Sequence, residues 1–552
     1  METYDGYGTR VTRPKLKGLT LSAAVVVASV GLVVSTVGVV RAAVTWGTAE
    51  PASFASGVQN AGRFALFNAV SCVSAGNCTA VGQFKNAAGG DEAFTQTSTD
   101  GMWGTAEPAS FETGVQNALP NAYFNEVSCA SAGNCTAVGQ FKNAAGDDEA
   151  FTQTSTDGVW ATARPASFGT GVQNGDPYAS LDSVSCVSAG NCTAVGYFLN
   201  AAGGSEAFTQ TSTGGVWGTA RPASFASGVQ NSNPEGWLTS VSCVSAGNCT
   251  AVGRFKNAAG YKEAFTQTST GGVWATARPA SFASGVQNSN PNAIFEAVSC
   301  VSAGNCTAVG YFSNPAGRIE AFTQTSTGGV WADGQPASFA SGVQSASPSA
   351  GLNSVSCVSA GNCTAVGYFR NAAGQYEAFT QSSTGGVWAT ARPASFATGV
   401  QNAITDAFLT SVSCVSAGNC TAAGQFRNAA GRIEAFTQTS TDGVWADGQP
   451  ASFASGVQYT NSNSYFMSVS CVSAGNCSAA GSFRNAAGGY EAFTQTATAP
   501  VAPTPTTVAP TPTTVAPPSL PETGSDGRVN VLIGLSLLLL GFGLRAWRRL
   551  SL

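Results

Sequence analysis

The sequence predicts an all-β fold, an eight-bladed β-propeller, and three observations lead to this prediction. A unit of 57 residues occurs eight times, so the repeat is the unit of folding. The array also begins and ends at different points of the unit, as a closed ring requires. Glycine, alanine, serine and threonine are abundant, whereas the apolar periodicity of amphipathic helices is missing, which favours short strands and tight turns.

The first two strands of each blade are predicted from a cysteine-containing hairpin. In the first unit, "FNAVSCVS" and "NCTAVGQF" flank "SAG", a three-residue loop in which Gly76 takes the left-handed conformation. This hairpin sets Cys72 opposite Cys78, and C-x5-C without histidine matches no common zinc spacing. One disulfide per blade and an oxidising, extracellular setting follow. The sixteen cysteines are Cys72, Cys78, Cys129, Cys135, Cys186, Cys192, Cys243, Cys249, Cys300, Cys306, Cys357, Cys363, Cys414, Cys420, Cys471 and Cys477.

The remainder of the unit supplies two more strands. The turn "KNAAG" leads into "EAFTQTST", whose alternating Phe and polar residues are typical of a half-buried strand. "DG" or "GG" then makes a tight hairpin turn, and "VWATARPASF" is the fourth strand. Four antiparallel strands in a meander make one propeller blade.

The phase of the array, residues 43–499, predicts how the ring closes. It starts with "VTWGTAEPASF", which is a fourth strand, and ends with "EAFTQTATA", which is a third strand. If Trp46 and its neighbours pair with Glu491 to Thr496, the N-terminal strand completes the last blade and leaves no exposed sheet edge. An open solenoid would instead need polar capping repeats, which the sequence does not contain.

The N-terminal segment predicts export, and a segment that follows the repeats predicts an extended linker. Residues 1–42 contain basic residues, a long apolar run and a small-residue pattern ending at Ala42, as in a cleaved signal peptide. The apolar run is also long enough for an uncleaved membrane anchor, but the cleavage pattern favours the signal peptide. Residues 500–519 are rich in proline and threonine, which favours an extended linker that spans the cell wall.

Residues 520–552 contain "LPETG", an apolar stretch from Val529 to Leu544 and the basic end "RAWRRLSL". This arrangement resembles the sorting signal of Gram-positive LPXTG surface proteins. The resemblance implies that a sortase cleaves after Thr523 and joins it covalently to a cell-wall peptide. The protein would then contact the membrane only through the precursor's apolar segment. The motif residues are Leu520, Pro521, Glu522, Thr523 and Gly524.

Two further patterns resemble those of known propellers. The segment "STDGVW" at Ser155 to Trp160 is similar to a shortened Asp-box turn of sialidase-like propellers, and the cysteine pattern is similar to repeats of secreted actinobacterial propeller proteins. Asp100, Asp157 and Asp442 keep the acidic residue, whereas other repeats have glycine. The resemblance therefore implies a turn-forming role for this position and does not imply sialidase activity.

Catalytic chemistry is disfavoured by composition and by symmetry. The chain has no histidine, and the predicted disulfides use every cysteine, so acid-base catalysis by imidazole and thiol nucleophiles are excluded. The repeated glutamates, such as Glu92, are interpreted as cross-strand partners of Lys or Arg residues such as Lys85. No metal cluster and no cofactor is predicted. The net charge of −5, without a basic patch, argues against nucleic acid as a partner.

The differences between repeats provide the main indication of function. The eight residues after "GVQ" vary in every unit, and a second varied position begins with Gln83. Aromatic residues in the first varied stretch are candidate platforms for an extracellular glycan or protein, namely Tyr123, Trp237, Phe408 and Tyr465. We therefore predict a wall-anchored, non-enzymatic binding or adhesion protein. The alternatives are a secreted carbohydrate-active hydrolase, a structural surface coat, and neutral drift in exposed loops.

Overall fold

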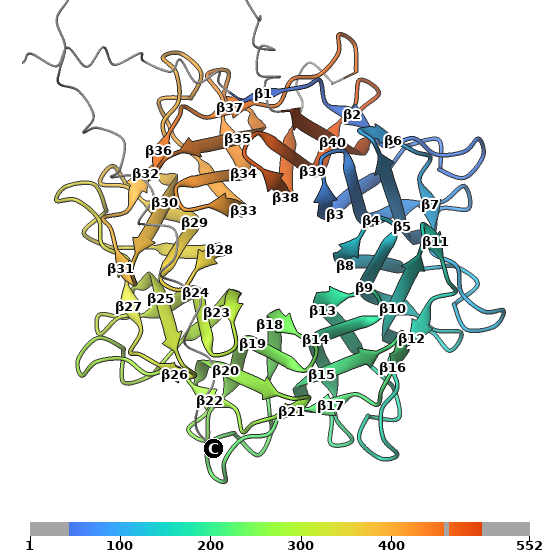
Figure 1. Cartoon of the computed structure of the whole chain (residues 1–552), viewed down its shortest axis with the longest axis horizontal. Coiled ribbons are helices and arrows are strands. Elements are labelled where there is room, and N and C mark those ends of the chain that lie inside the picture. Colours follow the sequence, from blue (N-terminus) through green and yellow to red (C-terminus); the bar gives the residue numbers. More distant parts are fainter. Residues whose placement is uncertain (1–43, 458–462, 499–552) are drawn as a thin grey trace, which may run out of the picture. The chain divides into compact units, whose positions relative to one another are not determined.

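A computed structural model describes residues 44–457 and 463–498, which form eight antiparallel sheets arranged around a central axis (Figure 1). The all-β, eight-bladed propeller predicted from the sequence is confirmed. Within these ranges there is no helix of the length and apolarity that crossing a membrane demands. The predicted signal peptide, linker and sorting signal lie outside the described residues.

Each blade contains three long strands, and the innermost strand lies nearest the central axis (Figure 1). The inner strands are β3 (Ala65–Ser74), β8 (Ala122–Ser131), β13 (Ala179–Ser188), β18 (Trp237–Ser245), β23 (Ala293–Ser302), β28 (Ala350–Ser359), β33 (Ala407–Ser416) and β38 (Ser464–Ser473). The second strands are β4 (Asn77–Lys85), β9 (Asn134–Lys142), β14 (Asn191–Leu199), β19 (Asn248–Lys256), β24 (Asn305–Ser313), β29 (Asn362–Arg370), β34 (Asn419–Arg427) and β39 (Asn476–Arg484). The third strands are β5 (Asp91–Thr99), β10 (Asp148–Thr156), β15 (Ser205–Thr213), β20 (Lys262–Thr270), β25 (Ile319–Thr327), β30 (Tyr376–Thr384), β35 (Ile433–Thr441) and β40 (Tyr490–Thr498).

The outermost strand is split, which the sequence did not predict. In the first blade β6 and β7 both pair with β5, and Gly104 lies between them. Gln96 Nε2 of the third strand donates a hydrogen bond to the Gly104 carbonyl at 2.7 Å, so a side chain supplies the partner of this carbonyl where the regular pairing is interrupted. The split pairs are β1 (Thr45–Trp46) and β2 (Glu50–Pro51), β6 (Met102–Trp103) and β7 (Glu107–Pro108), β11 (Val159–Trp160) and β12 (Arg164–Pro165), β16 (Val216–Trp217) and β17 (Arg221–Pro222), β21 (Val273–Trp274) and β22 (Arg278–Pro279), β26 (Val330–Trp331) and β27 (Gln335–Pro336), β31 (Val387–Trp388) and β32 (Arg392–Pro393), and β36 (Val444–Trp445) and β37 (Gln449–Pro450).

The predicted disulfides are confirmed in all eight blades, and their cysteines are cross-strand partners. The hairpin loop is two residues long rather than three, because Ser74 already pairs with Asn77. A register shift between Cys72 and Ser74 accommodates the additional residue as a β-bulge. Gly76 has a positive φ of 76°, as predicted.

The "DG" and "GG" turns have left-handed backbone at both central residues. In the first blade φ is 50° at Asp100 and 86° at Gly101, and in the third blade it is 56° at Gly214. Two positive φ values in a two-residue loop are typical of a type I′ turn, which tolerates Asp, Asn and Gly. The interpretation of the Asp-box-like aspartate as a turn former therefore agrees with the backbone.

Phenylalanines fill the space between neighbouring blades. Phe84 and Phe94 are fully buried, and Phe54, which enters from the connection with the preceding blade, lies 4.7 Å and 5.0 Å from their ring centroids. Ala480 and Ala492 of the eighth blade belong to the same cluster. Each core is thus shared by two blades, so an isolated blade cannot bury its apolar faces.

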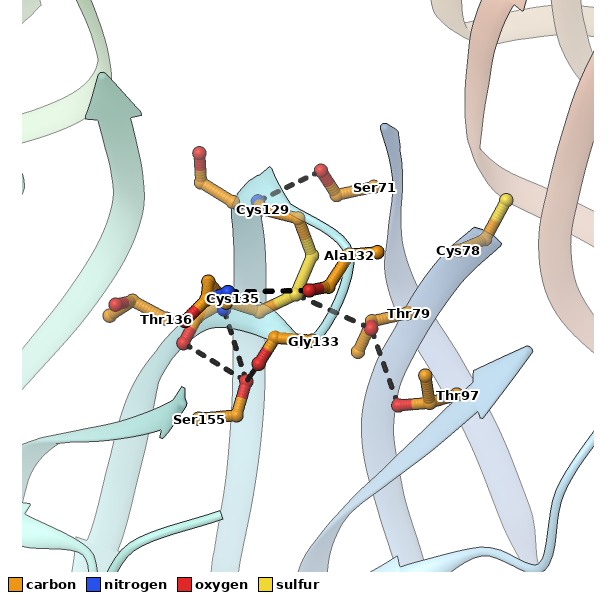
Figure 2. The surroundings of a disulfide bond; sticks show 12 residues. Ser71, Cys78, Thr79, Thr97, Cys129, Ala132, Gly133, Cys135, Thr136 and Ser155 are labelled. Atoms are coloured by element: carbon orange, nitrogen blue, oxygen red, sulfur yellow. Dashed lines mark hydrogen bonds between the residues drawn. A yellow bond between two sulfur atoms is a disulfide. The ribbon is translucent and has the colours of Figure 1, made fainter. Parts of the chain in front are cut away.

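A serine hydroxyl connects every pair of neighbouring inner strands. Ser71 Oγ of the first blade accepts a hydrogen bond from the backbone N–H of Cys129 in the second, at 3.1 Å (Figure 2). The equivalent bond, at 3.0 Å, joins Ser470 of the last blade to Cys72 of the first. It recurs at all eight junctions, which we call seams. One backbone N–H on the unpaired edge of each inner strand is therefore satisfied by the blade before it.

The N-terminal strands close the ring, as predicted. Thr45 pairs with Thr498 and Trp46 with Ala497, while Glu50 and Pro51 of β2 pair with the middle of β40. The last blade consequently contains strands from both ends of the array.

We expect deletion of residues 43–52 to lower the melting temperature and to promote self-association, because the edge of β40 becomes available for pairing with other chains. Differential scanning calorimetry and size-exclusion chromatography measure both effects. A circular permutant that carries residues 44–52 after Thr498 serves as the control and should regain the original stability. Unchanged melting and a monomeric elution profile of the truncated chain would contradict this role of β1 and β2.

Candidate functional site

The two ends of the inner strands define two rims that differ in sequence variation. The constant rim comprises Ser74–Asn77, Asp100–Gly101 and their equivalents, and the segment "SAGN" is identical in all eight repeats. The variable rim comprises Asn60–Leu66, Gln83–Lys85, Gly90–Asp91 and their equivalents among the described residues. Differences between repeats are thus concentrated at one end of the propeller.

Structural requirements explain much of the constant rim. The Gly101 N–H donates to the Gly76 carbonyl at 2.9 Å, and a Cβ on Gly76 would clash with that nitrogen. Asn77 Nδ2 donates to Ser74 Oγ at 2.9 Å. Clefts of about 230 to 340 Å³ lie between blades at this rim and are lined by the same constant residues.

The two varied positions identified in the sequence are direct cross-strand partners. Leu66 pairs with Gln83 in the first blade, and the same register holds in every blade. The four candidate residues therefore lie at the start of inner strands, half-buried, rather than in the connecting segments. Their partners on the second strands are Gln140 for Tyr123, Arg254 for Trp237, Gln425 for Phe408 and Ser482 for Tyr465.

Three aromatic residues on the second strands belong to the same site but were not among the sequence candidates. Tyr197, Tyr311 and Tyr368 occupy the position of Gln83 in the third, fifth and sixth blades. The cysteine pairing alone would align Leu66 with Phe84, because a second bulge, between Phe67 and Ala69, shifts the register by one residue. A bulge in the inner strand was therefore the missing signal.

Aromatic rings of neighbouring blades contact one another at the variable rim. Tyr197 lies 5.0 Å from Trp237 across one seam, and Tyr368 lies 5.3 Å from Phe408 across another. The Arg254 guanidinium lies 3.9 Å above the Trp237 ring, a cation–π contact. In the second blade the Tyr123 hydroxyl donates to Gln140 Oε1 at 2.8 Å, and burial raises the pKa of this tyrosine to about 12.

Two carboxyl groups break the eightfold symmetry beside these rings. Burial raises the pKa of Glu126 to about 7, although Ser183 and the Val184 backbone hydrogen-bond to its carboxylate. Burial also raises the pKa of Asp182 to about 6, although a hydrogen bond from Ser180 Oγ, at 2.7 Å, acts to lower it. Asp182 contributes to the raised pKa of Glu126 by charge repulsion, so the two groups are electrostatically coupled.

Asp182 occupies a seam position at which five other blades have a hydrogen-bond donor, and the remaining two have Glu296 and Met467. The equivalent Asn68 and Asn353 donate to the backbone carbonyls of Phe124 and Leu409 in the next blade, at 2.6 and 2.8 Å. Three further blades make the same contact through Asn or Thr. An ionised aspartate cannot donate, which agrees with the preference of this site for the protonated acid.

The repeated glutamates do not pair with Lys or Arg as the sequence analysis predicted. Glu92 Oε1 accepts a hydrogen bond from Asn86 Nδ2 at 2.7 Å, and the same Asn–Glu pair occurs in all eight blades. Lys85 instead pairs with Asp91 at 2.9 Å, because these two residues are cross-strand partners. Glu491 keeps its asparagine partner and also forms an ion pair with Arg63 of the first blade, at 3.3 Å. Within the described ranges no three His, Cys, Asp or Glu side chains are grouped to hold a metal.

Comparisons with known proteins find distant structural similarity only. No protein-family model and no curated protein matches the sequence. Similar solved structures include a protein of unknown function from Dyadobacter fermentans (13% identity, TM-score 0.35, 71% of this chain and 97% of that one) and Trypanosoma rangeli sialidase in complex with sialic acid (12%, 0.31, 71% and 55%). A third is a polysaccharide lyase, PL25 ulvanlyase (8%, 0.34, 81% and 93%). This chain thus spans about half of the sialidase, and likeness of this degree carries no information on activity.

We expect Asp182→Asn to stabilise the propeller at neutral pH, because asparagine supplies the seam donor and removes a buried charge. The folded pKa of Asp182 is above its ordinary value, so its contribution to stability is complete below about pH 4 and lost as pH rises through about 6. The gain should therefore be on the order of 1–3 kcal/mol at neutral pH and disappear near pH 4.

Chemical denaturation across this pH range measures the effect, and Asp182→Ala, which removes the charge without adding a donor, is the matched control. The interpretation is wrong if Asn and Ala variants are equally stable, or if the Asn variant gains nothing at neutral pH.

Proposed function

We propose that this protein is a cell-wall-anchored surface protein whose propeller binds an extracellular glycan or surface protein through its variable rim. One observation carries the proposal, the concentration of differences between repeats at that rim. Elsewhere the repeats differ at few positions, such as those of Asp100 and Glu107, and neutral drift alone would also alter exposed constant-rim residues such as Ala75, which is identical in every repeat. Repeat proteins commonly combine constant structural positions with a varied binding surface.

The location rests on two independent supports. Eight disulfides indicate a secreted or extracellular protein, because such bonds persist in oxidising surroundings. Attachment to the wall is supported by the "LPETG" motif with its apolar and basic segments. A protein fixed at the surface and carrying a ring of varied side chains suits adhesion.

A second candidate function is carbohydrate hydrolysis, and one observation favours it. Glu126 and Asp182 are coupled, have raised pKa values and occur at a single place in the ring. A carboxyl pair of this kind is what glycoside hydrolysis requires. Glu126, however, also replaces the serine that accepts the next blade's N–H at five seams, which accounts for it structurally.

For the anchor, we expect Thr523→Ala to release the protein from the wall into the medium or leave it in the membrane fraction, because the acyl bond to the wall peptide forms at Thr523. Cell fractionation followed by immunoblotting measures the distribution. Pro517→Ala, in the linker, is the matched control and should remain in the wall fraction. Wall retention of the Thr523 variant would contradict sortase anchoring.

For binding, we expect an oxidised propeller of residues 43–499 to bind components of a glycan or surface-protein array, and we expect Tyr178→Ser with Tyr376→Ser to reduce that binding. These tyrosines are 38% and 36% exposed on the variable rim. The control is Val159→Ser with Val330→Ser, at exposed apolar positions on the outermost strands. Equal loss in both variants, or no bound component at all, would argue against the variable rim as a binding surface.

A further inference from the structure

The varied cross-strand pair supplies one aromatic ring per blade in seven of the eight blades, from either strand. In the second, fourth, seventh and eighth blades the inner strand provides the ring, and in the third, fifth and sixth blades the second strand provides it. No blade has two rings at this pair, and the first blade has none. The pairs are Leu66/Gln83, Tyr123/Gln140, Ser180/Tyr197, Trp237/Arg254, Ile294/Tyr311, Gly351/Tyr368, Phe408/Gln425 and Tyr465/Ser482.

Packing alone does not explain this pattern. If the seam required a fixed side-chain volume, a large residue would always face a small one. Gly351 and Ser180 do face tyrosines, but Trp237 faces an arginine and Ile294 faces a tyrosine. The summed volume of the pair therefore varies widely, whereas the presence of a single ring is retained.

The rings from the second to the seventh blade lie at equivalent register positions, so they form an arc along the variable rim, and two pairs of neighbouring rings are in contact. Tyr197 contacts Trp237, and Tyr368 contacts Phe408, each across a seam. The rings are half-buried, so each keeps an accessible part while its neighbours fix its orientation.

The polar groups of the arc indicate a neutral ligand rich in hydroxyl groups. Tyrosine hydroxyls, the Gln140 amide and the Arg254 guanidinium offer both donors and acceptors. Asp182 accepts a hydrogen bond from Ser180, the cross-strand partner of Tyr197, so an anionic polymer would meet a carboxyl group next to this ring. Aromatic faces combined with a few polar groups are suited to the apolar faces and hydroxyls of sugars.

We propose that the arc from Tyr123 to Phe408 binds a linear, neutral polysaccharide, with successive sugar residues stacked on rings of successive blades. This inference rests on the proposed function and names its ligand class. The spacing between contacting rings is comparable with the length of one pyranose residue along such a chain. Several weak stacking contacts in series then give an affinity that grows with chain length.

The test uses the oxidised propeller of residues 43–499 and isothermal titration with chito-oligosaccharides and cello-oligosaccharides of increasing length. We expect affinity to rise with chain length. Tyr197→Leu, which keeps an apolar side chain but removes the ring, should weaken binding of the longer oligomers roughly tenfold. The double variant Tyr197→Ser with Ser180→Tyr moves the ring to the inner strand, as in the second blade, and should bind like the original protein.

A gain-of-function variant separates binding from packing. Leu66→Tyr recreates the Tyr123/Gln140 pair in the first blade and should increase the affinity for long oligomers, an effect that a purely structural ring does not produce. Melting curves confirm that each variant is folded. The inference is overturned if the affinity depends neither on chain length nor on the ring removed in Tyr197→Leu nor on the ring added in Leu66→Tyr. It is also overturned if no oligosaccharide binds.

The same measurements keep the two proposals apart. If the oligosaccharides do not bind but a surface protein on the array does, and Tyr178→Ser with Tyr376→Ser abolishes that binding, the polysaccharide inference is wrong and the variable-rim function stands. If neither class of ligand binds, both are wrong.

Discussion

The hydrogen bond from the next blade's inner strand to a serine hydroxyl is the interaction on which the ring depends. An inner strand has a free edge, and unpaired N–H groups on such an edge would be costly once neighbouring blades exclude water. The serine before each first cysteine satisfies one of these groups at the neighbouring cysteine, at 3.0 Å at the seam between the last and first blades. The disulfide fixes the hairpin that presents both partners, which explains why "SC" and "SAGNC" recur without change.

Much of the fold follows from the sequence because the repeats reveal it eight times. The cysteine spacing, the turn residues and the phase of the array together predict the strand order, the disulfides and the closing strands. Two of the errors share a physical origin, which is side chains that form hydrogen bonds of their own, whereas the length of the hairpin loop was wrong because of a β-bulge. Gln96 binds the Gly104 carbonyl with its side chain where the outermost strand is divided, and Asn86 takes the position that a lysine was expected to fill beside Glu92.

The candidate site was only partly predictable for a related reason. Differences between the repeats identified the positions of Leu66 and Gln83 in the sequence. A bulge after Phe67, which the sequence did not reveal, makes these two residues cross-strand partners. A one-residue shift turns a side chain to the opposite face of the sheet, so tyrosines such as Tyr197 could not be assigned to the site without the register. The coupled carboxyl groups were missed because each is an ordinary residue until burial changes its pKa.

Closure by β1 and β40 also sets the order in which the protein can acquire its final structure. The strand made first waits for a partner that is made almost last, and Gln495 bonds to Gly47 across a separation of 448 residues. Contacts of such long range form slowly, since most of the chain must already be ordered. Individual blades can assemble on their neighbours before the ring closes. The complete ring nevertheless forms only when the final repeat is present, so any chain interrupted before that point remains an open, edge-exposing intermediate that quality control can distinguish from the finished protein.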